Sequence, residues 1–481
     1  MPSFVKKILI GISVALTAFT SAAMSYDRCD SIPLGLEKLL SYTNPAVHIG
    51  VIVQSMNTGH VYFSRNAHQL FSPASTQKLL TVSAALINLT PNYRFPTRIL
   101  STGAIHQGVL DGNLIFQFNG DPSLNESNMI ALVGKLHAMG IDRIAGNIII
   151  DNTAFNHIPY PAGWLWSDLN SDFAAPLDTI VINRNKFGLT FIPTRSGERP
   201  RLIPHLPPGS ATFINDMRTT NYYEANCPLE IKSNERNQYL LTGCLARHAG
   251  TQGRSIAVRN MFMFTESLIR ELLRQHDIQF NGQIVAEKTP FNSHILTEHL
   301  SAPLKQVIVH LLKTSDNLYA DTLLKKMGEH YLHAPGSWQN GLQAEKLVFA
   351  DDAGINLNHL RLVDGAGLSQ YDKVTPSDLA EILNYIDHNA MLRTTLIPAL
   401  PIAGVDGTLA WRMPMLARGD RVHAKTGSMT GVSTLAGFVK TEHHGLLSFV
   451  IMINNVPENR FPYIALENHI VEFLATSGGC G

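Results

Sequence analysis

The sequence has no net charge and few charged side chains. Its 481 residues include 38 Lys and Arg against 38 Asp and Glu, and charged residues make up only 16%. A neutral chain has no electrostatic basis for binding nucleic acid or an anionic membrane surface. Hydrophobic residues make up 45%, which excludes the composition of disordered chains. We therefore expect a globular protein of about three domains, at roughly 100 to 200 residues each.

Long apolar runs are also absent. No segment approaches the roughly 18 consecutive apolar residues that a membrane-spanning helix needs. The longest run, residues 8–19, follows Lys6 and Lys7 and precedes small residues that end at Ala23. This order is typical of a secretory signal, with a buried core helix as the alternative. We expect residues 1–23 to be a signal peptide, cleaved near Ala23, and the soluble mature protein to reach the periplasm.

Cysteine is scarce, and no metal-binding pattern is present. The chain has four cysteines and contains neither Cys-x-x-Cys nor His-Glu-x-x-His, so no metal or cofactor is expected. Export would allow the cysteines to pair. Cys227 and Cys244 flank a polar turn and are expected to close a strand-turn-strand unit. Cys29 and Cys480 would tie the two mature ends together; free thiols are the alternative for both pairs.

The chain contains no internal repeat or low-complexity tract, so its organisation must be taken from apolar periodicity. A helical pattern starts at or beside Ser75 and returns at Leu304. Between them the sequence is rich in short strand patterns and turn residues. Segments with clear patterns are residues 112–118, 146–151, 422–428, 434–441 and 446–454 for strands, and 463–474 for a C-terminal helix.

Ser75-Thr76-Gln77-Lys78 is the first candidate catalytic motif. A serine nucleophile needs a base within hydrogen-bond reach, and a lysine three residues later on a helix lies on the same face. Unpaired N–H groups at a helix start can also stabilise an oxyanion. The pattern alone is weak, because Ser3 and Lys6 repeat it inside the expected signal peptide. Structural polar residues are the alternative.

Ser315-Asp316-Asn317 is the second candidate. It falls between two helical patterns, in a loop from which polar side chains can enter a cleft. Ser-x-Asn also occurs at residues 55–57, 64–66 and 123–125, and an ordinary turn or cap is the alternative for each.

Lys425-Thr426-Gly427-Ser428 is the third candidate. It is the only Lys-Ser/Thr-Gly segment of the chain and lies at the end of a predicted strand. Gly427 would let a substrate backbone approach the strand edge closely.

In this order the three motifs are the signature of penicillin-recognising serine hydrolases, which the chain resembles. The long interval between the first two motifs is similar to that of D-alanyl-D-alanine carboxypeptidase/endopeptidases of the penicillin-binding protein 4 type. The resemblance covers essentially the whole expected mature chain. Ala366 departs from the usual serine, in a turn expected to be peripheral to the chemistry. Further stretches that carry the resemblance are residues 73–78, 120–122, 163–168, 320–322, 364–369 and 400–409.

The resemblance implies a role for each motif residue. Ser75 would be the nucleophile and Lys78 its general base, kept neutral by burial and by the charge of Lys425. Ser315 would relay a proton to the leaving amine. Asn317 would hold the substrate amide and orient Lys78.

The third motif is implied to bind substrate. Lys425 and Thr426 would hold the terminal carboxylate of the peptide. Gly427 would allow its backbone to approach, and the backbone N–H groups of Ser75 and Ser428 would form the oxyanion hole.

Asp168 follows two tryptophans and could cap a turn. The resemblance instead implies that Asp168 and Phe173 line a substrate pocket, where the carboxylate would bind the free amino group of a diaminopimelate-type side chain.

The expected fold is α/β (α+β): a transpeptidase/β-lactamase-like domain with an antiparallel sheet and helices, plus two strand-rich inserted domains. The catalytic domain would comprise residues 24–90 and 300–481. One insertion would cover 91–180 and 250–299, and a nested one 181–249. Boundaries are uncertain by ten residues or more.

The expected activity is cleavage of D-Ala-D-Ala termini and of cross-links in peptidoglycan through an acyl-enzyme. Peptidoglycan stem peptides would be the substrates and β-lactams covalent inhibitors; a homodimer stays open. The alternatives are a β-lactam hydrolase of the same fold, which would need a competent deacylating water, and a non-catalytic peptidoglycan-binding protein.

Overall fold

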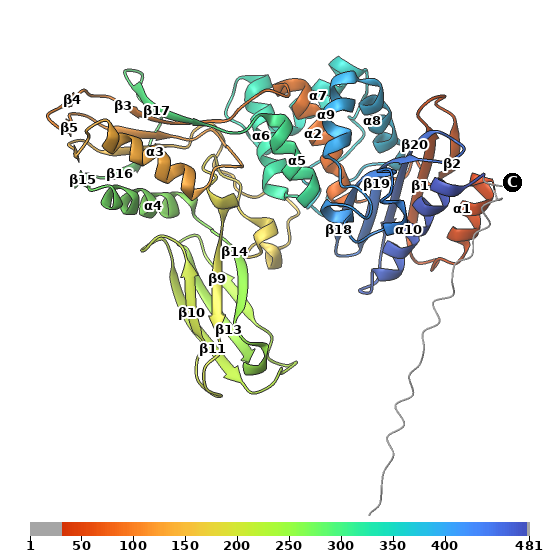
Figure 1. The fold of residues 1–481 in the computed structure, drawn as a ribbon, viewed down its shortest axis with the longest axis horizontal. Coiled ribbons are helices and arrows are strands. Elements are labelled where there is room, and N and C mark those ends of the chain that lie inside the picture. Colours follow the sequence, from red (N-terminus) through yellow and green to blue (C-terminus); the bar gives the residue numbers. More distant parts are fainter. Residues whose placement is uncertain (1–30, 479–481) are drawn as a thin grey trace, which may run out of the picture.

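The computed structural model describes residues 31–478 (Figure 1). The expected signal peptide, Cys29 and Cys480 lie outside the described residues. The predicted α/β (α+β) class is confirmed, since helices combine with two antiparallel sheets and three sheets that mix parallel and antiparallel pairs in the described chain. Its helices are all too short or too polar to cross a membrane, for the residues described.

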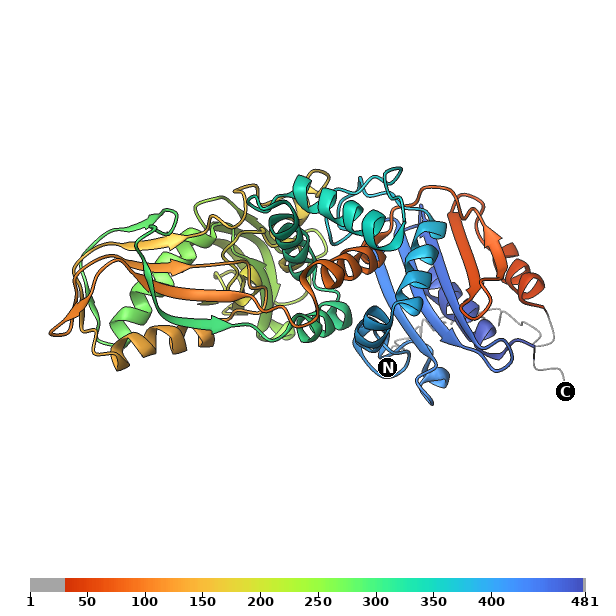
Figure 2. The same ribbon diagram turned by 90° about the horizontal axis from the view of Figure 1, so that it is seen from above.

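One five-stranded antiparallel sheet joins the two ends of the described chain. Strand β1 pairs with β20 along its whole length, from His48 opposite Asn454 to Ser55 opposite Leu447. Figure 2 shows these N-terminal strands in red beside the blue C-terminal ones. The three C-terminal strands lie within two residues of their predicted positions. In the order β18-β19-β20-β1-β2 the strands span Val422–Met429, Val432–Lys440, Leu446–Asn454, His48–Ser55 and Val61–Arg65.

Helices cover both faces of this sheet, so both faces are apolar. On one face, α1 (Ile32–Ser41) and α10 (Phe461–Thr476) share a hydrophobic cluster with the sheet. The other face packs against a helical layer with its own cluster. The helices of this layer are α2 (Lys78–Leu89), α5 (Leu304–Thr314), α6 (Asn317–Leu332), α7 (Trp338–Ala353), α8 (Pro376–His388) and α9 (Ala390–Leu396).

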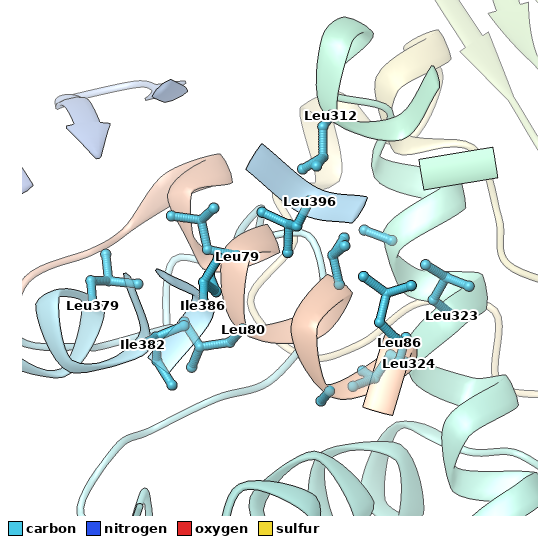
Figure 3. Packing of buried hydrophobic residues seen from close by; sticks show 14 of the residues in the cluster. Leu79, Leu80, Leu86, Leu312, Leu323, Leu324, Leu379, Ile382, Ile386 and Leu396 are labelled. Carbon is cyan, nitrogen blue, oxygen red and sulfur yellow. The ribbon is translucent and has the colours of Figure 1, made fainter. Parts of the chain in front are cut away.

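Helix α2 lies in the middle of the helical layer. Ten of its 12 residues are buried, which is typical of a helix packed on every side. Figure 3 shows Leu79, Leu80 and Leu86 of α2 surrounded by leucines and isoleucines of four other helices. A helix packed in this way fixes the position of its first residue, Lys78, and of the turn before it, which contains Ser75.

The residues between α2 and α5 form a separate lobe, on the left in Figure 1. A five-stranded sheet and a four-stranded sheet pack against α3 (Glu126–Ala138) and α4 (Met261–Gln275) around one hydrophobic cluster. The sheets are β16-β8-β6-β3-β17 and β15-β7-β5-β4. In chain order β3 to β8 span Pro96–Ser101, Ile105–His106, Val109–Leu110, Leu114–Gln117, Arg143–Ile144 and Ile148–Asp151, and β15 to β17 span Gln279–Phe280, Ile284–Ala286 and His294–Leu300.

Two three-stranded sheets project from this lobe and share its hydrophobic cluster. The predicted Cys227–Cys244 disulfide is present and joins the start of the β12–β13 hairpin to β13. The domain boundaries given above stay a prediction. In the order β10-β9-β14 and β11-β13-β12 the strands span Arg201–His205, Lys186–Ile192, Gln252–Ala257, Thr212–Thr220, Gln238–Ala246 and Glu230–Ser233.

Removing the disulfide tests how far it stabilises the projecting sheets. In a Cys227→Ser/Cys244→Ser variant we expect the local opening free energy of β12 and β13 to fall by about 3 kcal/mol, because a loop of this length loses its closure constraint. Amide hydrogen exchange in β13 should then accelerate roughly a hundredfold. Exchange in β19 and β20 is the internal control. Unchanged exchange in β13 would contradict this stabilising role.

Candidate active site

Ser75 lies in a tight turn that leads directly into α2, so a helix starts beside it, as the sequence predicts. A 3-10 turn spans Ala74–Gln77, and α2 begins at Lys78. Ala74 has a left-handed backbone with φ of 46°, which costs an alanine about 1 to 3 kcal/mol. The carbonyl oxygen of Pro73 accepts hydrogen bonds from the Thr76 hydroxyl (2.7 Å) and from the Thr434 hydroxyl of β19 (2.8 Å). The surrounding structure therefore holds Ser75 in a strained turn.

The Lys78 amine makes three short contacts with three separate segments. Its Nζ lies 2.8 Å from the Ser75 hydroxyl, 2.7 Å from Oδ1 of Asn317 and 2.7 Å from the carbonyl oxygen of Ala366. The side chain is fully buried. Burial lowers the pKa of Lys78 to about 8, although the nearby Asp321 carboxylate acts in the opposite direction.

The three contacts suit a neutral amine. A neutral amine has two N–H groups and one lone pair. It can donate to Asn317 and to the Ala366 carbonyl, and accept the proton of the Ser75 hydroxyl. This is the geometry required of a general base, and the lowered pKa makes the neutral form accessible near neutral pH.

The turn over residues 364–369 is part of this arrangement, contrary to our expectation that it is peripheral. The buried Asp364 carboxylate accepts hydrogen bonds from four successive backbone N–H groups, those of residues 366–369, and from Nε1 of Trp164 at 2.8 Å. Gly367 has φ of 76°, and a Cβ there would lie 1.9 Å from the Ala74 carbonyl oxygen. Since Ala366 contacts Lys78 through its carbonyl, the departure from serine leaves that contact intact.

Ser315 and Asn317 occupy the junction between α5 and α6. Ser315 ends α5 in a left-handed conformation with φ of 58°, and Asp316 caps α6 by accepting from the Tyr319 N–H. The sequence placed Asn317 in a loop between two helices, but it is the first residue of α6. Its amide bridges the two lobes: Oδ1 accepts from Lys78, and Nδ2 donates to the Phe173 carbonyl at 2.8 Å.

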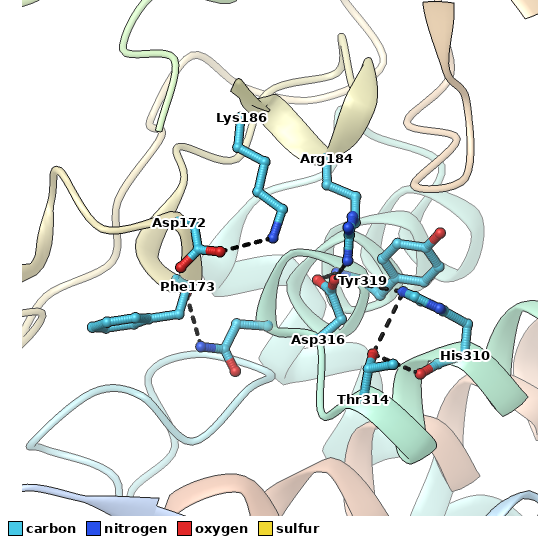
Figure 4. A network of polar contacts seen from close by, with 9 residues as sticks. Asp172, Phe173, Arg184, Lys186, His310, Thr314, Asp316 and Tyr319 are labelled. Carbon is cyan, nitrogen blue, oxygen red and sulfur yellow. Dashed lines mark hydrogen bonds and ion pairs between the residues drawn. The ribbon is translucent and has the colours of Figure 1, made fainter. Parts of the chain in front are cut away.

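A second bridge reaches the same junction from the inserted lobe (Figure 4). The guanidinium of Arg184 lies 3.3 Å from the Asp316 carboxylate. Arg184 belongs to a left-handed turn of three residues, with φ of 52°, 59° and 53° for residues 183–185. Nδ2 of Asn185 fixes that turn by donating to the Pro176 carbonyl. The pKa of Asp316 is lowered despite burial, because the His310 ring and the Arg184 guanidinium both lie beside its carboxylate.

Lys425 lies behind the cleft, as the fourth of the eight residues of β18. Its Nζ donates to the Ser315 hydroxyl at 2.8 Å and to the Thr426 carbonyl at 2.6 Å, and its side chain is fully buried. Burial, together with the charge of Lys78, lowers its pKa well below the usual value. At Gly427 a Cβ would lie 2.1 Å from the Thr434 hydroxyl and 2.9 Å from the Ser75 nitrogen. Only glycine lets β18 approach the Ser75 turn this closely.

A cleft of about 760 Å³ opens over these motifs. The structure brings most of the predicted site residues to its wall, whereas Lys78, Lys425 and Gly427 lie beneath it. The sequence reasoning missed several lining residues: Leu368 and Thr408 lie in stretches that carry the family resemblance, but Gln370, Glu458 and Arg460 have no motif signal. The predicted residues that line the cleft are Ser75, Asp168, Phe173, Ser315, Asn317, Thr426 and Ser428.

Asp168 ends a 3-10 turn, Trp166–Asp168, on the wall of the cleft. Its carboxylate accepts a hydrogen bond from the Ser167 hydroxyl at 3.2 Å. Within residues 31–478 it caps no backbone N–H and forms no ion pair, so it is available to a cation in the cleft. Phe173 is 47% exposed beside it, and gives this end of the cleft an apolar surface.

One cluster of potential metal ligands occurs among the described residues, formed by Glu224, Cys227 and Cys244. Both cysteines are joined in the disulfide, and a metal-binding cysteine must be a free thiolate. This cluster therefore offers no metal site.

The sequence matches the D-Ala-D-Ala carboxypeptidase 3 (S13) family over residues 36–477. It is 33% identical to the D-alanyl-D-alanine carboxypeptidase DacB of Haemophilus influenzae, over 93% of this chain and 94% of that protein. The crystal structure of penicillin binding protein 4 (dacB) from that organism superposes with a TM-score of 0.85 at 32% identity, covering 92% of this chain and 99% of the other.

A second crystal structure of that protein, in a complex with a β-lactam, superposes with a TM-score of 0.79 at 30% identity, covering 92% of this chain and 99% of the other. The resemblance stated from the three motifs is thus confirmed. With a match over nearly all the described residues and a relative above 30% identity, the chain belongs to the D-Ala-D-Ala carboxypeptidase 3 (S13) family.

Proposed function

We propose that this protein is a serine DD-peptidase that cleaves D-Ala-D-Ala termini, and D-Ala-diaminopimelate cross-links, of peptidoglycan through an acyl-enzyme on Ser75. The observation that carries the proposal is the contact of the Ser75 hydroxyl with the buried Lys78 amine, at the floor of an open cleft. Family membership supports the same activity. The complex of the related protein with a β-lactam supports inhibition by that class of compound.

Acylation begins with proton transfer from the Ser75 hydroxyl to neutral Lys78. The serine oxygen bonds to the carbonyl carbon of the penultimate D-Ala, and the bond from that carbon to the leaving nitrogen breaks. Ser315, held by Lys425 at 2.8 Å, relays the proton to the leaving amine. Water then hydrolyses the ester and returns Ser75 to its hydroxyl form.

The developing oxyanion would be stabilised by the backbone N–H groups of Ser75 and Ser428. The close approach of β18 to the Ser75 turn at Gly427 supports this assignment. Fixed backbone donors of this kind contribute about 2.7 to 4 kcal/mol each to the transition state. The Thr426 hydroxyl, which donates to the Thr408 hydroxyl at 2.7 Å, would turn to the substrate carboxylate, and Lys425 would add its charge from behind the strand.

We further propose that the protein acts outside the cytoplasm, in the periplasm, after removal of residues 1–23. The order of charged, apolar and small residues in that segment supports export. Its proposed substrate, peptidoglycan, lies in that compartment. The mass of the mature protein in solution tests whether it forms a homodimer.

Replacing Ser75 tests the nucleophile. We expect Ser75→Ala to lose covalent labelling by a fluorescent penicillin and to hydrolyse D-Ala-D-Ala peptides at least about a thousandfold more slowly. Peptide mapping of the labelled wild type should place the adduct on Ser75. A label that persists in the variant would rule out the assignment. Ser83→Ala, on the same helix but buried away from the cleft, is the matched control.

The pH dependence of acylation tests Lys78 as the base. Because the neutral amine is the reactive form and its pKa is about 8, the acylation rate should rise with pH through about 8 and then level off. Lys78→Ala should acylate far more slowly and lose this pH dependence, while still binding substrate. A wild-type rate that falls over the same range, or normal acylation of the variant, would exclude Lys78 as the base.

Replacing Asp168 tests substrate recognition separately from catalysis. If its carboxylate binds the amino group of a diaminopimelate side chain, Asp168→Asn should slow hydrolysis of amine-bearing stem peptides roughly ten- to a hundredfold. Penicillin acylation should hardly change, because benzylpenicillin lacks that amine. Rates for both substrates on one purified variant provide the measurement. Equal losses on both would show that Asp168 supports the fold or the catalytic groups instead.

A further inference from the structure

The substrate proposed above carries a negative charge that the cleft must accommodate. A peptide ending in D-Ala and a penicillin both present a carboxylate on the leaving-group side of the scissile amide. A carboxylate taken from water into a cleft needs a cation or several N–H and O–H donors. Given the proposed function, on which this inference rests, one of the basic side chains at the cleft must supply that cation.

Lys425, the cation that the sequence suggested, does not line the cleft. Its side chain is fully buried, and its Nζ donates to the Ser315 hydroxyl and the Thr426 carbonyl. Lys78 is equally buried, and all three of its contacts are made within the protein. A substrate carboxylate in the cleft therefore cannot reach either ammonium group without a rearrangement of these buried contacts.

Arg460 is the one basic side chain among the described residues that line the cleft. It precedes α10, and its guanidinium donates to the Ser428 hydroxyl at 2.6 Å. No carboxylate lies within ion-pair distance of it in the part of the chain described. Because a guanidinium has five N–H donors, most remain for a ligand, and the Ser428 hydroxyl still has its own proton to donate.

We propose that Arg460 is a specificity-determining residue that binds the substrate carboxylate, together with the hydroxyls of Ser428 and Thr426. Arg460 would supply the full positive charge at the surface of the cleft, and Lys425 would fix Ser315 and Thr426 from behind. The carboxylate would accept from the guanidinium and from the Ser428 hydroxyl on the same strand edge.

The charges of the cleft support this placement. Its other charged lining residues, Asp168 and Glu458, are acidic, so Arg460 is the one charged side chain of the described wall that attracts a carboxylate. A substrate with an ammonium group on the acyl side and a carboxylate on the leaving side is then held in one direction only. Like-charge repulsion and ion pairing together would fix its orientation across Ser75.

The test compares one penicillin with its carboxyl methyl ester, which has the same ring but no negative charge. For Arg460→Gln we expect the second-order acylation rate constant to fall roughly ten- to a hundredfold for the acid, the effect of losing one charge-assisted hydrogen-bonded pair. The ester should react within about twofold of its wild-type rate. Arg460→Lys should restore part of the rate for the acid, because the charge is kept.

A matched control uses Arg418, which is exposed at the turn before β18 and does not line the cleft. Arg418→Gln removes the same charge from the protein and should leave both rates unchanged.

Ser428→Ala removes the partner of the guanidinium. If Arg460 merely holds Ser428 in place, Arg460→Gln and Ser428→Ala should each slow acylation by the acid and by the ester to the same extent. This result would overturn the proposal.

A binding measurement separates this proposal from the proposed function. In Ser75→Ala, calorimetric affinity for a D-Ala-D-Ala peptide and for its C-terminal amide does not depend on acylation. In the Ser75→Ala protein, we expect Arg460→Gln to weaken binding of the peptide acid roughly ten- to a hundredfold and to leave binding of the peptide amide unchanged. An unchanged affinity for the acid would overturn the role of Arg460, whether or not the wild type forms an acyl-enzyme. Failure of wild-type acylation alone would contradict only the proposed function.

Discussion

Burial of the Lys78 amine is the constraint on which the rest of the site depends. A buried amine without hydrogen-bond partners costs several kcal/mol, so three hydrogen-bond partners must be brought to it from the Ser75 turn, α6 and the turn over residues 364–369. Each of these segments is itself fixed by buried contacts: α2 on all sides, Asp316 at the start of α6, and the Asp364 carboxylate in its turn. The same burial lowers the pKa of the amine, which makes it useful as a base.

The cleft is completed by the inserted lobe and not by the catalytic helices and sheet alone. Asn317 touches Lys78 with one end of its amide and the Phe173 backbone with the other. Arg184 and Asp316 form a second link close by. The insertion therefore contributes the pocket around Asp168 and also restrains the first residues of α6. A long insertion between the first two motifs is consistent with this arrangement, because its 3-10 turns at residues 166–168 and 172–174 form part of the cleft wall.

The electrostatics of the site are arranged in two layers. Beneath the cleft lie two buried amines with lowered pKa values, Lys78, which is the proposed base, and Lys425, which holds Ser315. At the surface, Asp168 and Arg460 lie among the lining residues with opposite charge. The proposed roles follow this division, with proton transfer assigned to the buried Lys78 and substrate selection to the groups at the surface of the cleft.

The sequence by itself determined the family, the mixed fold class, the Cys227–Cys244 pair and the strands β18 to β20, because these depend on local periodicity and on motifs of adjacent residues. It could not predict the left-handed Ala74, since an alanine adopts that conformation only under tertiary restraint. The contact of the Ala366 carbonyl with Lys78 is a backbone interaction across 288 positions, to which side-chain type gives no clue. Arg460 lies in no motif and becomes part of the cleft only because α10 begins beside Ser428. Tertiary packing decided these features, because it alone sets which distant groups share a buried environment.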